Sequence, residues 1–296
     1  MSLLLDRFAI PNILVERNTT TTQYPKARGL MSRSMEMFRQ LGIEDRVRVH
    51  EAVDTGIVLV ESMAGRAIAR VPPEPPDTVS TPCWKSTVVQ NAVEEEMFRA
   101  AQACPYTQLR FGTEFLSLEQ DGVLASAQVR DVVAGSVSTV TARYVVAADG
   151  AGSTTRTAAG IPLEGETIGA ALSQYWRADL SALPAASKDF AFFIYSDDPA
   201  VPPGTSVISD RFDHHWLSIF HVGIDAVSHE TRPWTDGEMI GIIRAQIGIP
   251  DLEVELRDWS VWRISNQLAE TYRRGCVFLV GDAAHLMPPS GGFGLN

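Results

Sequence analysis

Cysteine is scarce in this sequence, and the three residues present (Cys83, Cys104 and Cys276) lie far apart. An odd number of cysteines with no Cys-x-x-Cys pair favours neither a disulfide framework nor a zinc site. This usage is typical of a reducing compartment, so we expect a cytoplasmic protein without a bound metal.

The sequence also lacks a long hydrophobic run and a basic run. The opening MSLLLDRFAI is interrupted by Asp6 and Arg7, which leaves it too short for a signal peptide or a membrane span. The formal net charge is -11, and no basic run is available to release counterions from nucleic acid. We therefore expect no membrane span and no nucleic-acid partner.

The 296 residues, 45% of them hydrophobic, are enough for one large or two ordinary domains. Unbroken apolar runs at Ile13–Val15, Tyr144–Ala148 and Cys276–Val280 are typical of buried parallel strands. Residues 163–265 instead alternate in the manner of antiparallel strands. We predict an α/β nucleotide-binding domain interrupted by a mainly β domain, with boundaries at 1–162, 163–265 and 266–296.

Local patterns predict further elements. Ser32 is expected to cap a helix that Gly42 ends. The remaining predictions are a helix tail over Ser2–Phe8, helices over Gln90–Ala103 and Glu238–Ile247, strands at 57–61 and 67–71, and an antiparallel meander over 114–118, 123–129 and 137–141.

Acidic residues follow the three apolar runs. Glu16 ends the first run, and a carboxylate there binds a ribose in dinucleotide folds, although many strand-end carboxylates are simply solvated. Asp149-Gly150 follows the second run, with Ser153 as a predicted helix N-cap and glycine allowing close approach to a pyrophosphate. Asp282 follows the third run, ahead of a side-chain-poor segment of proline and glycine suited to a planar ring.

These segments resemble the signatures of the para-hydroxybenzoate hydroxylase-like family of FAD-binding monooxygenases. YPKARGLMSRSMEMFRQLG resembles the family's arginine segment, which implies that Arg28 contacts the flavin diphosphate. VVQNAVEEEM resembles a helix that offers Gln90 to the flavin. Asp149 and Gly150 match a motif linked to both FAD and NAD(P)H, with Arg156 bracing it.

The resemblance continues to the end of the chain. Asp282 matches the family's G-D motif, which holds the ribityl and diphosphate region. The residues that match the turn beside the isoalloxazine are Pro289, Gly292, Gly294, Leu295 and Asn296. The implied fold is a Rossmann-like FAD-binding domain interrupted by a β substrate domain. We expect the chain to lack both ends of the flavin site, because the family's glycine-rich turn would precede Met1 and its long helix would follow Asn296.

The resemblance implies hydroxylation of a small aromatic substrate, phenolic or polyketide-like, with FAD, NAD(P)H and O₂ through a flavin C4a-hydroperoxide. It specifies no catalytic base and no oligomeric state, and it implies a structural role for His285. One alternative is another flavoenzyme, a reductase or a halogenase, although Trp259-Ser-Val-Trp262 lacks the spacing of the halogenase motif. The other alternative is a non-catalytic fragment that cannot hold FAD.

Overall fold

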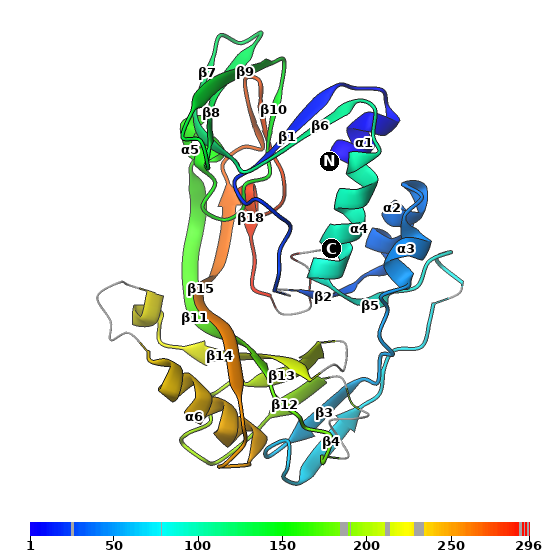
Figure 1. The fold of residues 1–296 in the computed structure, drawn as a ribbon, viewed down its shortest axis with the longest axis vertical. Coiled ribbons are helices and arrows are strands. Elements are labelled where there is room, and N and C mark those ends of the chain that lie inside the picture. The colour runs from blue at the N-terminus through cyan, green and yellow to red at the C-terminus, as the bar shows by residue number, and fades with distance from the viewer. Residues whose placement is uncertain are drawn as a thin grey trace.

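The computed structural model describes residues 1–24, 27–77, 79–183, 189, 191–210, 214–227, 234–289, 292, 294 and 296 (Figure 1). The helices are α1 (Ser2–Arg7), α2 (Ser32–Gln40), α3 (Glu44–Arg48), α4 (Gln90–Gln102), α5 (Thr154–Ala158) and α6 (Asp236–Ile247), with short 3-10 helices η1 (Ile224–Val227) and η2 (Gly281–Ala283).

The strands fall into one large sheet and several small ones. They are β1 (Asn12–Glu16), β2 (Arg28–Leu30), β3 (Ile57–Val60), β4 (Ala67–Val71), β5 (Ser86–Val89), β6 (Thr107–Phe111), β7 (Thr113–Gln120), β8 (Ala125–Asp131), β9 (Val137–Ala142), β10 (Val145–Ala147), β11 (Leu163–Arg177), β12 (Ala191–Ile194), β13 (Ser206–Asp210), β14 (His215–Val222), β15 (Glu255–Ala269), β16 (Arg273–Arg274), β17 (Val277–Leu279) and β18 (His285–Leu286).

The small sheets contain the predicted parallel strands. β1 pairs with β6, and β10 pairs with β17, both in parallel. β7, β8 and β9 form the predicted antiparallel meander. The strand β6 was not predicted, because its sequence TQLRF mixes polar and apolar residues without a clear period.

The large sheet has the strand order β18-β15-β11-β14-β13-β12-β3-β4. The long strands β11 and β15 run side by side from the small sheets down to α6 (Figure 1). β3 joins the sheet by parallel pairing with β12, in the register Ala191↔Ile57. Two strands of the large sheet, β3 and β4, therefore come from the part of the chain before residue 162. The mixed α/β class is confirmed.

One face of the large sheet packs against α6. Along β11, Leu172, Gln174 and Trp176 are fully buried and alternate with less buried residues, as the two-residue period of a strand requires. Trp176 packs in one cluster with Ile243 and Ile247 of α6. The hydrophobic cluster that contains Trp176 therefore lies on the α6 side of the sheet.

Local signals explain both ends of α6. Thr235 and Glu238 form a capping box at its start, which satisfies backbone N–H groups that would otherwise lack partners. Gly248 ends the helix in the left-handed conformation at φ +81°, where a β-carbon would also meet Ser62 Oγ at 2.5 Å.

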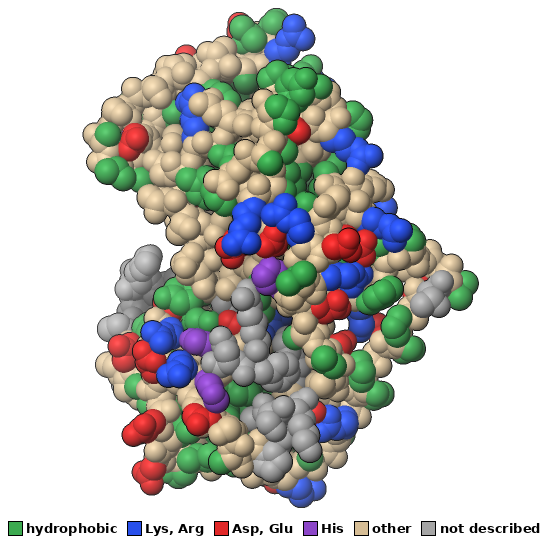
Figure 2. Space-filling view, turned by 45° about the vertical axis from the view of Figure 1, so that its right-hand side comes forward, with side chains coloured by type: hydrophobic (Ala, Val, Ile, Leu, Met, Phe, Trp, Pro, Cys, Tyr) green, Lys and Arg blue, Asp and Glu red, His purple; other side chains and the backbone are tan. Residues whose placement is uncertain are grey.

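The surface carries mixed charge. Figure 2 shows Lys and Arg side chains lying beside Asp and Glu side chains across this face. In α3 and α4, Arg46 pairs with Glu96, and Arg48 pairs with Glu44, each at 2.9 Å. Positive charge in this region is thus neutralised locally. Among the described helices, none is long and apolar enough to cross a bilayer.

Candidate functional site

Arg28 and Gln90 are brought together by the β2–β5 ladder. Arg28 pairs with Val89, and the Gln90 backbone N–H donates to the Ala27 carbonyl at 3.0 Å. The Arg28 side chain is only 6% exposed and lies 3.9 Å from the Asp210 carboxylate. The Gln90 amide donates to Glu94 at 2.7 Å. The two residues implied by the resemblance thus share one location although they are far apart in sequence.

Asp149 organises the turn between β10 and α5. Its carboxylate accepts hydrogen bonds from the Ser153 hydroxyl and, at 2.9 Å, from the Thr155 N–H. Ser153 Oγ accepts from the Arg156 N–H at 2.9 Å, so Ser153 is the predicted N-cap. Gly150 has φ +79°, a conformation that favours glycine. Two of the first amides of α5 are therefore already used within the chain rather than presented to a ligand.

Arg156 does not brace Asp149 through its guanidinium. Its Nη1 donates instead to the carbonyl of Ile161 at 3.0 Å, across the turn that follows α5. The side chain thus fixes the connection between α5 and β11.

Ser153→Ala should lower the free energy of unfolding by about 0.5–2 kcal/mol, because it removes the N-cap acceptor and a hydrogen bond to Asp149. Urea unfolding followed by circular dichroism measures the change. Ser138→Ala, an exposed position on β9, is the matched control and should stay within about 0.5 kcal/mol of the wild type. Equal losses in the two variants would contradict this role for Ser153.

Asp282 lies at the same sheet edge as Asp149. β10 and β17 run parallel with Ala147 opposite Leu279, and the Val280 N–H donates to the Ala147 carbonyl at 3.0 Å. The carboxyl ends of both strands therefore meet. The Asp282 side chain is exposed and makes no hydrogen bond or ion pair with any residue that the structure describes. Its acceptor atoms are available to a ligand.

Asn296 joins the end of the chain to the start of α2. Its Oδ1 accepts from the Met31 N–H at 2.6 Å and from the Ser34 hydroxyl at 2.9 Å. Its Nδ2 donates to the carbonyls of Gly29 and Gly292 at 3.3 and 2.7 Å. The expectation that Ser32 caps α2 is wrong. The N-cap residue is Met31, and its side chain makes no capping hydrogen bond.

The remaining residues of the last motif are only partly described. The Gly292 N–H donates to the Pro289 carbonyl at 3.0 Å, and Gly292 has φ +72°. Pro289 and Gly294 are exposed. Leu295 lies outside the described residues. Asn296 attaches Gly292 to the segment that carries Arg28.

Glu16 stands apart from the other acidic candidates. It ends β1, and its Oε1 accepts from the Asn18 N–H at 2.8 Å. The β1–β6 pair and the β10–β17–β16 sheet share no ladder within the described parts of the chain. The structure therefore brings Asp149 and Asp282 to one edge, and places Glu16 at the end of a different sheet.

The sequence did not predict a role for Asp210, a buried carboxylate on the face of the large sheet opposite α6. Asp210, at the end of β13, is buried and accepts a hydrogen bond from the Tyr175 hydroxyl of β11 at 2.7 Å. The Tyr175 ring stacks on His215, with centroids 5.7 Å apart, and contacts Tyr24 at 5.1 Å. A sequence signal was available, because Asp210 directly follows the strand-like segment SVIS.

The same face is turned toward the segment of Arg28. Asp210 pairs with His215, and Tyr175 lies in register with Leu217, so these side chains share the face opposite α6. Trp262 also lies there and donates to the Ser173 hydroxyl at 2.9 Å. This face therefore carries the aromatic side chains of Tyr175 and Trp262, and the polar side chain of Asp210 lies on it beside Arg28.

The whole chain matches one protein family. The match is to the family described as FAD binding domain, and it covers residues 1–296. This chain belongs to that FAD-binding family. The resemblance found in the sequence is therefore confirmed at the level of the family.

Relatives of this FAD-binding chain include enzymes named for aromatic and polyketide substrates. It is 31% identical over 310 residues to a 4-methyl-5-nitrocatechol 5-monooxygenase of Burkholderia, covering 100% of this chain and 55% of the relative. It is 33% identical over 315 residues to a phenol 2-monooxygenase of Pseudomonas, covering 100% and 48%. The chain thus spans about half the length of the curated relatives that it matches.

Solved structures of FAD-binding monooxygenases share its fold. The flavin-dependent monooxygenase PieE, in complex with FAD and substrate, superposes with a TM-score of 0.85 at 33% identity, covering 100% of this chain and 52% of that one. An aklavinone-11 hydroxylase in a ternary complex with FAD and aklavinone gives 0.86 at 26% identity, covering 99% and 56%.

The residues present fit the FAD group implied by the family. Asp282 offers an exposed carboxylate without a partner among the described residues, and Gly281 beside it has φ +56°, where no side chain crowds the approach. Asp149 and Asp282 meet at the carboxyl ends of parallel strands, where ligands of α/β sheets bind. No three His, Cys, Asp or Glu side chains of the described residues gather as a metal site requires.

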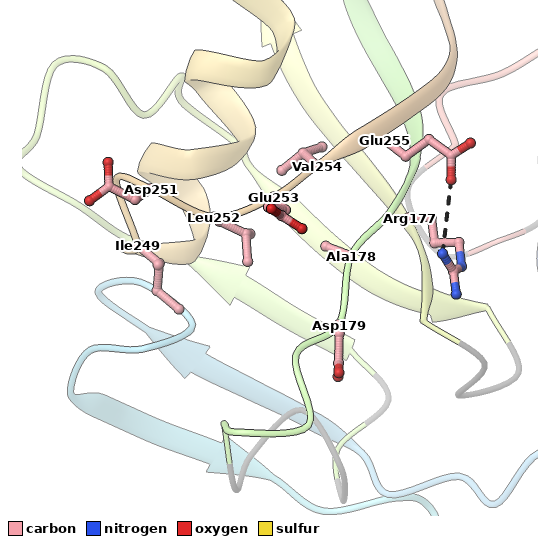
Figure 3. A pocket seen from close by; sticks show the side chains of 9 residues that line it. All are labelled: Arg177, Ala178, Asp179, Ile249, Asp251, Leu252, Glu253, Val254 and Glu255. Atoms are coloured by element: carbon pink, nitrogen blue, oxygen red, sulfur yellow. Dashed lines mark ion pairs between the residues drawn. The ribbon is translucent and has the colours of Figure 1, made fainter.

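A separate cavity of about 640 Å³ does not fit FAD. It lies between the end of β11 and the loop after α6, and none of the predicted site residues lines it (Figure 3). Its carboxylates are Asp179, Asp251, Glu253 and Glu255, and Arg177 faces Glu255 at 4.0 Å. Like charges would repel the FAD diphosphate there, so this cavity is not a cofactor site of the family.

Proposed function

We propose that the protein is a FAD-dependent monooxygenase that hydroxylates an aromatic substrate, phenolic or polyketide-like. The observation that carries the proposal is the match along the whole chain to monooxygenases and hydroxylases named for such substrates. NAD(P)H as the reductant, dioxygen as the oxidant and a cytoplasmic location are parts of the same proposal.

The chain's own residues would hold the cofactor from two sides. Asp282 would accept hydrogen bonds from the ribityl hydroxyls, because its carboxylate is exposed and unused among the described residues. Arg28 would face the diphosphate, with Gln90 beside it. Asp149 would act mainly by fixing the backbone at Gly150 and the start of α5. When bound, FAD supplies the redox chemistry and the activation of oxygen.

The large sheet would form one wall of the substrate site. Its face opposite α6 carries the half-buried Trp262 and Tyr175, which would offer aromatic surface to a planar ring. The same face is beside Arg28, on the side of the proposed cofactor site. A substrate held against this wall would be shielded from water by the sheet.

The full-length protein should purify with non-covalent FAD, because Asp282 is placed to accept from the ribityl chain and Arg28 to face the diphosphate. The measurement is release of the ligand by denaturation and its identification by chromatography, followed by a screen for substrate-dependent NAD(P)H oxidation with phenols and polyketides. Heat-denatured protein incubated with FAD is the control for adventitious binding. Finding FMN, or no flavin after reconstitution with FAD, would overturn the proposal.

A further inference from the structure

A buried ion pair connects the cofactor-side segment to the large sheet. The side chains of Arg28 and Asp210 are each 6% exposed, and Arg28 Nη2 lies 3.9 Å from Asp210 Oδ1. The other carboxylate oxygen, Oδ2, accepts the Tyr175 hydroxyl at 2.7 Å. Arg28 comes from β2 and Asp210 from β13, so the pair joins parts of the chain that are far apart in sequence.

The pair is held by charge rather than by a close hydrogen bond. Asp210 Oδ1 is buried and accepts no hydrogen bond from a described residue. Close contacts between arginine and a carboxylate or phosphate measure about 2.7–2.9 Å and are frequently bidentate. At 3.9 Å, Arg28 gains attraction from Asp210 without the geometry of a strong contact. A phosphate within reach of the same guanidinium would make a closer one.

We infer that Asp210 is a counter-ion of Arg28 in the cofactor-free protein, and that the FAD diphosphate competes with it for Arg28. The inference rests on the proposed function, because it assumes that Arg28 faces the diphosphate. Asp210 thereby sets the affinity for FAD, and it links cofactor binding to the sheet that forms the proposed substrate wall.

Charge explains why the two anions compete. The guanidinium and the carboxylate neutralise each other in a buried environment, where charges need partners. A diphosphate beside them adds negative charge close to Asp210, and like charges repel strongly where water is excluded. When Arg28 turns to the diphosphate, Asp210 Oδ2 keeps its hydrogen bond from the Tyr175 hydroxyl. Exchange is therefore favoured over simultaneous binding.

The test is FAD titration of the full-length protein, with flavin fluorescence as the readout. Asp210→Asn removes the competing charge but keeps the shape, so FAD should bind about tenfold more tightly, equivalent to about 1.4 kcal/mol. Tyr175→Phe should act in the opposite direction. Without its hydroxyl, Asp210 depends more on Arg28, and FAD should bind about threefold to tenfold more weakly.

Asp189→Asn is the matched control. Asp189 is another buried carboxylate beside the large sheet, 3% exposed, and it pairs with Arg70 of β4 rather than with Arg28. Loss of the Asp189 charge should destabilise the fold but leave FAD affinity within about twofold of the wild type. A general loosening of the sheet would instead change FAD affinity in both asparagine variants.

The outcomes separate this inference from the proposed function. If the wild type binds FAD and Asp210→Asn binds it equally or more weakly, Asp210 does not compete and the inference is wrong. If Asp210→Asn fails to fold, Tyr175→Phe decides, since equal or tighter FAD binding by that variant overturns the inference. If the wild type itself binds no FAD, the proposed function fails and the inference fails with it.

Discussion

Trp176→Ala is expected to lower the free energy of unfolding by about 3–5 kcal/mol. The side chain is 0% exposed, and its Nε1 donates to the Ser218 hydroxyl at 2.9 Å. Its ring packs near Trp216, with centroids 6.0 Å apart, in the cluster that joins the sheet to α6. Alanine would leave a cavity and a buried hydroxyl without its donor, and both effects destabilise the fold.

Urea unfolding of the purified protein, followed by far-ultraviolet circular dichroism, measures this loss. Trp84→Ala is the control, since Trp84 is 45% exposed and its main described contact is the Arg48 guanidinium at 4.5 Å. That contact contributes only about 0.5–1 kcal/mol. Similar losses in the two variants would show that Trp176 is not at the centre of the core. A loss of 3–5 kcal/mol is a large part of the ~5–15 kcal/mol that stabilises a typical domain.

Asp282→Ala should weaken FAD binding by roughly tenfold to a hundredfold, because it removes a charged hydrogen-bond acceptor that contributes about 1.5–3 kcal/mol. Asp282→Asn keeps the shape and one acceptor oxygen, so it should lose less affinity. Neither change should affect folding stability by much, since the carboxylate is exposed and has no partner among the described residues. FAD titration by flavin fluorescence gives the affinity of each variant.

The same variants distinguish binding from chemistry. Activity should recover in large part at saturating FAD if Asp282 only holds the cofactor. Glu119→Ala, which removes an exposed carboxylate from the meander strand β7, controls for the change in net charge and should leave FAD affinity unchanged. Unchanged affinity with abolished turnover in Asp282→Ala would instead make Asp282 a catalytic residue.

The residues assigned to the cofactor differ in what the structure supports. Asp282 is exposed, whereas the Asp149 carboxylate already accepts two hydrogen bonds within its own turn. Arg28 is buried beside Asp210. The resemblance implies that all three residues bind FAD, but the geometry predicts a different effect of mutation at each. A change at Asp282 should alter FAD affinity, and a change at Asp149 should alter local stability. A change at Arg28 should alter the competition between Asp210 and the FAD diphosphate.

The sequence by itself determined the elements whose signals are local. Apolar runs predicted β1, β10 and β17 as parallel strands. The burial expected of such runs holds best for β17, whereas β1 has no buried residue. The meander and α4 followed from period and from turn residues. The cap at Ser153 was also predicted, since a helix start depends on only a few neighbouring residues. The family followed from motifs in the same segments.

Tertiary structure decided which of these elements meet. The pairing of β3 with β12 and the attachment of Asn296 to Met31, 265 residues away, have no local signal. The burial of Arg28 beside Asp210 likewise depends on how one face of the large sheet lies against β2. Hydrophobic period specifies which face of a strand is buried but not which partner covers it. Long-range pairing and the partners of buried charges therefore became visible only in the folded chain.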